Sequence, residues 1–171
     1  MIDMMIVNTA IIAFGFLMLW AAFNDVRAFK IPNWIPGLII VSWVAAAPFM
    51  SIGLAGLGLH LAVFAGVLSI GMALWSQGFL GGGDVKLIAA GALWFGWPDV
   101  MSFIFIATLA GGVLALGLLV LRRFVPVLPL ATSRFENTVL EPGAPAPYGV
   151  AIAAGALWVL PQSAIFAHYI A

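Results

Sequence analysis

The most constraining feature of this sequence is the length of its apolar runs. Between Lys30 and Asp84 the chain has no Asp, Glu, Lys or Arg residue, and Met4–Phe23 and Val100–Leu121 are also free of charge. Runs of about 18 or more apolar residues allow a helix to cross the hydrocarbon of a bilayer. Hydrophobic residues make up 65% of the chain and charged residues 7%, too few to cover the surface of a water-soluble domain. The sequence therefore predicts an all-α integral membrane protein.

Composition also excludes several classes of protein. The formal net charge is zero and the six Lys and Arg residues are scattered, so the chain has no basic patch for nucleic acid. It has no cysteine, which excludes disulfide frameworks and thiolate metal sites. We expect the lipid bilayer, and not nucleic acid, to be a partner of this chain.

The apolar runs divide into six predicted transmembrane helices that form one domain. Pro48 and a glycine cluster that begins at Gly53 interrupt the long run after Lys30, because proline ends a helix and clustered glycines mark chain breaks. The predicted spans are residues 4–23, 35–49, 57–75, 85–97, 100–121 and 148–166. A helix over 85–97 covers only about 20 Å of a ~30 Å core, so we expect neighbouring helices or a wet cavity to surround it.

The positive charges orient these spans. With six crossings, every basic residue falls on the same side of the membrane: Arg27, Lys30, Lys86, Arg122, Arg123 and Arg134. Cytoplasmic loops carry an excess of Lys and Arg, which predicts that this side, including the long loop 122–147, is cytoplasmic. Both chain termini are then predicted on the opposite side.

Two aspartates on the predicted cytoplasmic side are candidate functional residues. Asp84 follows Gly81, Gly82 and Gly83 at the start of the fourth span. A glycine run permits positive φ angles and lets another backbone approach the acid closely, as an extended peptide substrate would have to do. The alternative is a hinge in which Asp84 serves as a helix N-cap.

Asp25 lies in a second compact cluster, residues 24–33, after the first span. Pro32 forces Ile31 out of helical geometry and Asn33 can turn the chain, so we expect a structured elbow that fixes the acid in place. The alternative is a loop residue whose charge balances Arg27.

A pair of aspartates has a specific chemical use. Two carboxyl groups about 3 Å apart cannot both ionise, so one keeps its proton while the other deprotonates a water that attacks an amide carbonyl. Such a pair needs no metal and no cofactor. Because a helix N-terminus favours negative charge and a C-terminus disfavours it, the helix ends predict that Asp84 is the base and Asp25 the protonated partner.

These motifs together resemble a known family. Gly81-Gly82-Gly83-Asp84 has the Gly-x-Gly-Asp pattern of membrane aspartic proteases, and with Asp25-x-Arg27 and Ile31-Pro32-Asn33 it is similar to the type IV prepilin peptidases. Pro147-Tyr148-Gly149 resembles a segment before the last helix of the short members. The chain lacks the cytoplasmic domain and zinc-binding cysteines of the long members, so it resembles the short enzymes of Flp, or tight-adherence, pili.

The resemblance implies cleavage of the basic leader from prepilins and pseudopilins at the cytoplasmic face of the bacterial inner membrane, just before the apolar helix that becomes the core of the pilus. Asp25 and Asp84 match the catalytic pair of the family, and we predict no N-methylation. Lys86 and Arg27 are candidates to meet an acidic residue of the substrate, or else anchor the chain in the membrane. Glu136 and Glu141 of loop 122–147 are candidates to attract the basic leader, or belong to a solvated linker. His60 is expected to be a neutral, hydrogen-bonded histidine.

Two other readings remain open at this point. In the first, the aspartates bind a cation at the mouth of a small channel or transporter. Transport sites usually lie near the bilayer midplane, whereas these acids lie at one edge, and no internal repeat is visible. In the second, the chain is an inactive scaffold of pilus assembly that keeps the fold and cleaves nothing.

Overall fold

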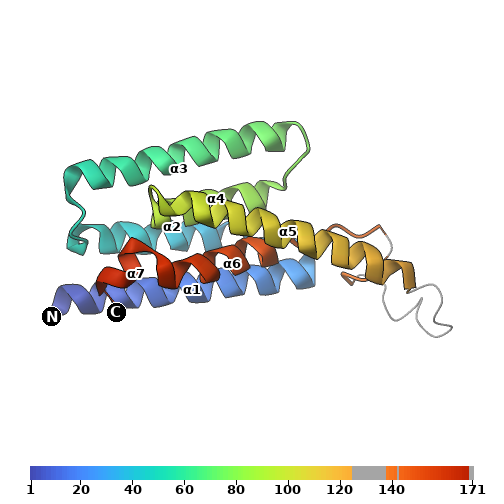
Figure 1. Ribbon diagram of the computed structural model, residues 1–171, viewed down its shortest axis with the longest axis horizontal. Coiled ribbons are helices and arrows are strands. Elements are labelled where there is room, and N and C mark those ends of the chain that lie inside the picture. Colours follow the sequence, from blue (N-terminus) through green and yellow to red (C-terminus); the bar gives the residue numbers. More distant parts are fainter. Residues whose placement is uncertain (125–137, 142, 170–171) are drawn as a thin grey trace.

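The structure is a computed structural model that describes residues 1–124, 138–141 and 143–169. Within these residues the chain is helical and contains no β-strand, which confirms the predicted all-α class. The elements, drawn in Figure 1, are α1 (Ile2–Ala28), α2 (Trp34–Ala46), η1 (Ala47–Phe49), α3 (Gly53–Ser76), α4 (Gly82–Phe95), α5 (Asp99–Phe124), α6 (Tyr148–Val159), η3 (Leu160–Gln162) and α7 (Ala164–Tyr169).

The apolar runs became helices of two lengths. Helices α1, α3 and α5 are long and apolar enough to cross a membrane, whereas Trp34–Phe49 and Tyr148–Gln162 are shorter apolar helices. The predicted span 4–23 ended too early, because α1 continues to Ala28 and ends at Phe29, which takes the left-handed conformation with φ 50°. Asp25 is therefore a helical residue, and the non-helical elbow is confined to residues 29–33.

Two predicted breaks differ from the observed ones. The sequence predicts that the glycines at 56 and 58 belong to the break before the third span, but α3 begins at Gly53 and includes both. The predicted last span, 148–166, is interrupted by η3 at Pro161, and the chain resumes as α7. Proline removes a backbone donor from the helix ladder, which explains the interruption.

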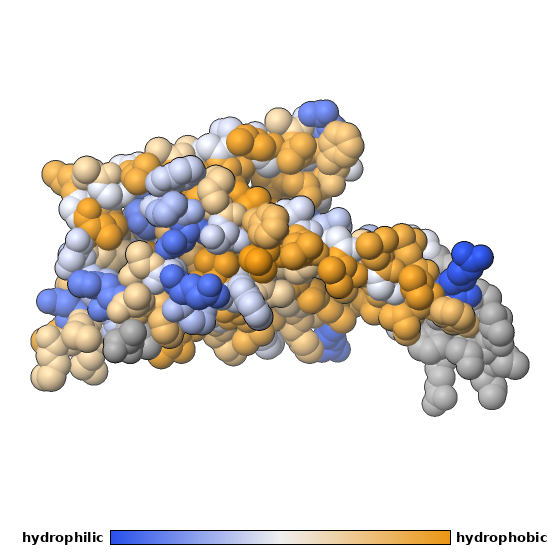
Figure 2. All heavy atoms as spheres, in the orientation of Figure 1, coloured by the Kyte–Doolittle hydropathy of each residue, from blue (hydrophilic) through white to orange (hydrophobic). Residues whose placement is uncertain are grey.

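Helix α4 lies in the interior of the bundle, as we expected for a span this short. Nearly every residue from Leu87 to Phe95 is buried, whereas α3 and α5 expose most of their apolar side chains. In Figure 1, α4 lies between α3 and the other helices, and Figure 2 shows a largely hydrophobic surface along α5. Neighbouring helices thus cover the polar backbone of α4, and the outer helices present apolar side chains to lipid.

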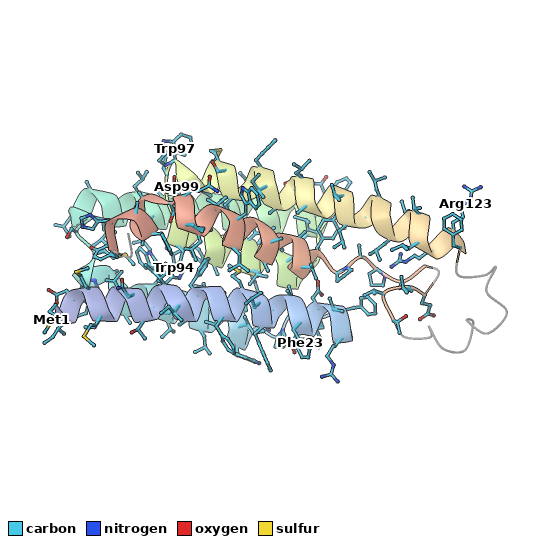
Figure 3. All side chains as sticks on the ribbon, turned by 60° about the horizontal axis from the view of Figure 1, so that its bottom comes forward. Met1, Phe23, Trp94, Trp97, Asp99 and Arg123 are labelled. Carbon is cyan, nitrogen blue, oxygen red and sulfur yellow. The ribbon has the colours of Figure 1, made fainter. Side chains whose placement is uncertain are left out.

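The two aspartates of interest lie at the same end of the bundle. Figure 3 places Phe23 and Arg123 at one end, and Met1, Trp97 and Asp99 at the other. Both acids of interest belong to the first of these ends, because Asp25 follows Phe23 in the last turns of α1 and Asp84 opens α4, which runs back toward Trp97.

Helices α5 and α6 approach each other closely at Gly155. A Cβ added there would lie 2.7 Å from the backbone nitrogen of Ala107 and 2.8 Å from its Cα, so the two backbones touch. We expect Gly155→Val to force the helices apart and to lower the free energy of unfolding by about 3 kcal/mol. Thermal unfolding in detergent measures this, with Gly117→Val as the control, because a Cβ at Gly117 meets nothing within 4 Å. Equal melting temperatures would contradict the close packing.

Candidate active site

Asp25 is a buried acid near the C-terminal end of α1. Its side chain is 6% exposed, and the backbone N–H of Gly149 donates a hydrogen bond of 2.7 Å to its Oδ2. Gly149 lies in the first turn of α6, directly after Pro147 and Tyr148. The three residues that the sequence singled out before the last helix therefore bring a free N–H of a helix N-terminus to the first aspartate.

Asp84 lies in the first turn of α4, where it is half-buried. The preceding glycines do not take positive φ as expected: Gly81 is extended with φ −71°, and Gly82 and Gly83 begin the helix. Their contribution is space, since a Cβ on Gly81 would lie 2.7 Å from Oδ2 of Asp84. The missing side chain leaves the carboxylate room beside the loop.

Ile31 of the elbow joins the two acid-bearing segments. A Cβ on Gly83 would lie 3.2 Å from Cβ of Ile31 and 3.5 Å from its carbonyl oxygen, so the elbow packs closely against the start of α4 beside Asp84. A Cβ on Gly149 would lie 3.1 Å from Cδ1 of the same isoleucine and 3.0 Å from Cβ of Asp25. Ile31 is 5% exposed, so this packing fixes the acids relative to each other.

The two carboxylates influence each other although no hydrogen bond joins them. Asp84 precedes the apolar segment 85–97, and its pKa is raised to about 6, first by burial and then by the negative charge of Asp25; the backbone of Gly81 opposes the shift. The Gly149 N–H bond stabilises the ionised form of Asp25. The negative charge of Asp25 thus works against an ionised Asp84, whereas the helix ends predict Asp84 as the ionised base, and the assignment of the proton stays a prediction.

The other candidates around the acids divide into two groups. Nζ of Lys86 donates a hydrogen bond of 2.9 Å to Oδ1 of Asn33, so the elbow after Pro32 is tied to α4. Arg27 is exposed, and its guanidinium lies 5.2 Å from the ring centre of Phe23. Lys86 therefore belongs to the framework of the site, while Arg27 contacts neither aspartate.

Other polar residues of interest are placed away from the acids. His60 is buried, and its Nδ1 lies 2.7 Å from the carbonyl oxygen of Leu93, which agrees with the expected hydrogen-bonded histidine and shows that Nδ1 is the protonated nitrogen. Arg122 belongs to α5, not to the loop, and donates to the carbonyl oxygens of Val139 and Pro145. Arg134 and Glu136 lie outside the described residues.

Sequence reasoning missed Ile31 as a packing residue and Gly149 as a hydrogen-bond donor. The signals were present: Ile31 is fixed in an extended conformation by Pro32, and Gly149 follows a proline at a helix start, where backbone donors lack helical partners. Within the described parts of the chain, no three His, Asp or Glu side chains are arranged to hold a metal ion. What the site brings together is one buried carboxyl group, that of Asp25, and one half-buried carboxyl group, that of Asp84.

Comparison with known proteins agrees with this arrangement. No curated protein and no solved structure matches the chain. The model of the type IV leader peptidase family matches residues 12–116, which is more than half of the chain and includes Asp25, the elbow and Asp84. A match of this extent confirms the resemblance seen in the motifs and, with the long apolar helices, indicates a membrane-embedded peptidase. The chain belongs to the type IV leader peptidase family.

Proposed function

We propose that this protein is an aspartic endopeptidase that removes the basic leader of Flp-like prepilins and pseudopilins. The observation that supports this most is the proximity of the two acids at one end of the bundle: the charge of Asp25 raises the pKa of Asp84, and the glycines beside them, Gly83 and Gly149, lie against the same buried isoleucine. The site would hold a water between the carboxyl groups and admit an extended peptide past the glycines before Asp84. The absence of the cysteines of the long members favours leader cleavage without N-methylation.

The proposed reaction follows from the environments of the acids. Ionised Asp25 takes a proton from water, whose oxygen attacks the scissile amide carbon. Protonated Asp84 donates its proton to the carbonyl oxygen, which gives a tetrahedral intermediate with two hydroxyl groups. Asp25 then passes the proton that it took from water to the departing nitrogen, while Asp84 takes a proton back from one of the hydroxyl groups. The C–N bond breaks, leaving a carboxyl group on the leader and an amine on the new N-terminus, and both aspartates are back in their starting states.

We further propose that the chain crosses the bacterial inner membrane six times, through residues 4–23, 35–49, 57–75, 85–97, 100–121 and 148–166, so that Asp25 and Asp84 lie just outside the spans. The end of the bundle that carries Asp25 and Asp84 would then face the cytoplasm, and both termini the periplasm. This orientation follows the basic residues at that end, Arg27 and Arg123 among them, and requires α4 to reach across by being wrapped in protein.

Reconstitution tests the proposed activity. The purified protein in liposomes is mixed with a full-length Flp-like prepilin, and the new N-terminus is read by mass spectrometry. We expect a single cut directly before the apolar helix. The proposal would be contradicted if the precursor stayed intact in liposomes in which circular dichroism shows that the protein is folded. A second substrate with a neutral leader shows whether the basic residues matter.

The pH dependence of cleavage tests which acid is protonated. Because the pKa of Asp84 is raised to about 6, this group is protonated below that pH and loses its proton above it. If Asp84 is the proton donor, kcat/KM falls as pH rises through about 6 and then drops about tenfold per pH unit. A rate that rises through pH 6 would assign the role of base to Asp84 instead. Thermal unfolding over the same range checks that the fold is intact.

A further inference from the structure

An apolar groove runs along the bundle beside the two acids. It has a volume of about 490 Å³ and lies between α3 on one side and α5 and α6 on the other, with α4 forming its floor. Its walls include Ile70, Leu74, Val85, Ile104, Gly112 and Tyr148. Among the described residues that line it, Thr108 and Tyr148 alone carry polar side-chain atoms. The groove therefore suits an apolar occupant.

The groove is continuous with the candidate site through the chain itself. Val85 follows Asp84 directly, and Tyr148 precedes Gly149, whose N–H is bound to Asp25. The chain thus leads from one wall residue directly to Asp84, and from another, through Gly149, to Asp25. The groove continues away from the acids along α5, from Gly112 to Ile104, which is about 12 Å at 1.5 Å per residue. An occupant that enters at the acids would extend for two helical turns along this wall.

We propose that this groove binds the first turns of the substrate's apolar helix, directly after the cleaved bond. The inference rests on the proposed leader cleavage and adds the surface that recognises the part of the substrate that is kept. An apolar wall offers few partners to backbone N–H and C=O groups, so the segment within it must satisfy them internally, as a helix does. At the glycines before Asp84 the substrate must instead be extended, which places the scissile bond just outside the groove.

The outer wall allows such a helix to enter from the lipid. Helix α3 packs mainly against α4, and Ile70 is 65% exposed although it lines the groove. On α5, a Cβ added to Gly112 meets nothing within 4 Å, so the opposite wall is open there. A substrate helix could therefore pack against both walls without any element of the bundle being displaced.

Two glycines of α5 provide a matched test. Gly112→Phe places a ring in the groove, whereas Gly117→Phe adds the same ring on the same helix where a Cβ also meets nothing. We expect Gly112→Phe to raise KM for a full-length prepilin at least tenfold relative to Gly117→Phe. A soluble peptide that contains the leader and the scissile bond but lacks the apolar helix should be cut equally by both variants.

The outcomes separate the groove from the activity. If the wild-type protein and Gly117→Phe cut the precursor normally, the proposed leader cleavage stands. A KM of Gly112→Phe equal to that of Gly117→Phe would then overturn the proposed role of the groove alone. The groove would also be overturned if Gly112→Phe slowed cleavage of the short peptide as much as cleavage of the full-length precursor, because the ring would then be disturbing the two aspartates. If a lipid fills the groove instead, the precursor's KM will not respond to Gly112→Phe.

Cross-linking gives a readout that does not depend on turnover. The chain has no cysteine, so single cysteines can be introduced at Ile70 in the groove and at Leu61, an exposed residue of α3 outside it. In an Asp84→Asn background, a prepilin with one cysteine in the first two turns of its apolar helix should form a disulfide with Ile70→Cys at least tenfold faster than with Leu61→Cys. Equal rates would reject the groove as the binding surface.

Discussion

Asp25→Asn and Asp84→Asn each lower kcat/KM for prepilin cleavage by about 10³-fold or more, if the two acids share one proton in the reaction. General acid and base groups each contribute about 10²–10⁴-fold, and neither partner can substitute for the other once one carboxyl has become an amide. The isosteric change leaves the shape of the site unaltered. Initial rates on a reconstituted precursor measure the loss.

A third aspartate supplies the control. Asp3 lies in the first turn of α1, at the opposite end of that helix from Asp25, so Asp3→Asn should cut at the wild-type rate. Near-normal cleavage by Asp25→Asn or by Asp84→Asn would refute a mechanism in which both acids take part. If the wild type also fails to cut any precursor, the scaffold and cation-channel readings return, and ion flux through liposomes distinguishes them.

The sequence anticipated the helices because apolar composition determines what lies in lipid. Five of the six predicted segments correspond to helices whose ends differ from the predicted ends by up to five residues, and the short fourth segment indicated that α4 needed protein around it. The ends were less predictable. Hydropathy marks where apolar residues stop, whereas α1 continues through Asn24 to Ala28 because nothing in that stretch breaks the backbone ladder.

The motifs identified the two acids but not the packing that positions them. The predicted position of Asp25 and Asp84 on one side of the membrane and the resemblance to a family predicted that they belong to one site. The contacts of Ile31 with Gly83 and Gly149 join three distant segments and follow from no local pattern. Which acid holds the proton is not predictable from local sequence for a related reason. Helix dipoles can be inferred from sequence, whereas burial and the Gly149 hydrogen bond depend on the tertiary structure.

A side chain at Gly149 should disable the site while leaving the fold in place. A Cβ there would lie 3.0 Å from both Cβ and Oδ2 of Asp25 and 3.1 Å from Cδ1 of Ile31, closer than these atoms normally pack. The γ-methyl groups of valine add to the crowding, so Gly149→Val displaces Asp25 from its N–H donor. Since misplacement of a reacting group by about 1 Å can cost 10²-fold, we expect kcat to fall about 10²-fold.

Gly149 acts through Asp25, so its effect must differ from that of a general loss of stability. KM should stay within about threefold of wild type, because the groove is unchanged, and the limb of the pH profile near 6 should move, because the partner of Asp84 has shifted. Gly37→Val is the control: a Cβ at this helical glycine of α2 meets nothing within 4 Å. A full rate for Gly149→Val with an unmoved pH limb would mean that the Gly149 N–H does not position Asp25 for catalysis.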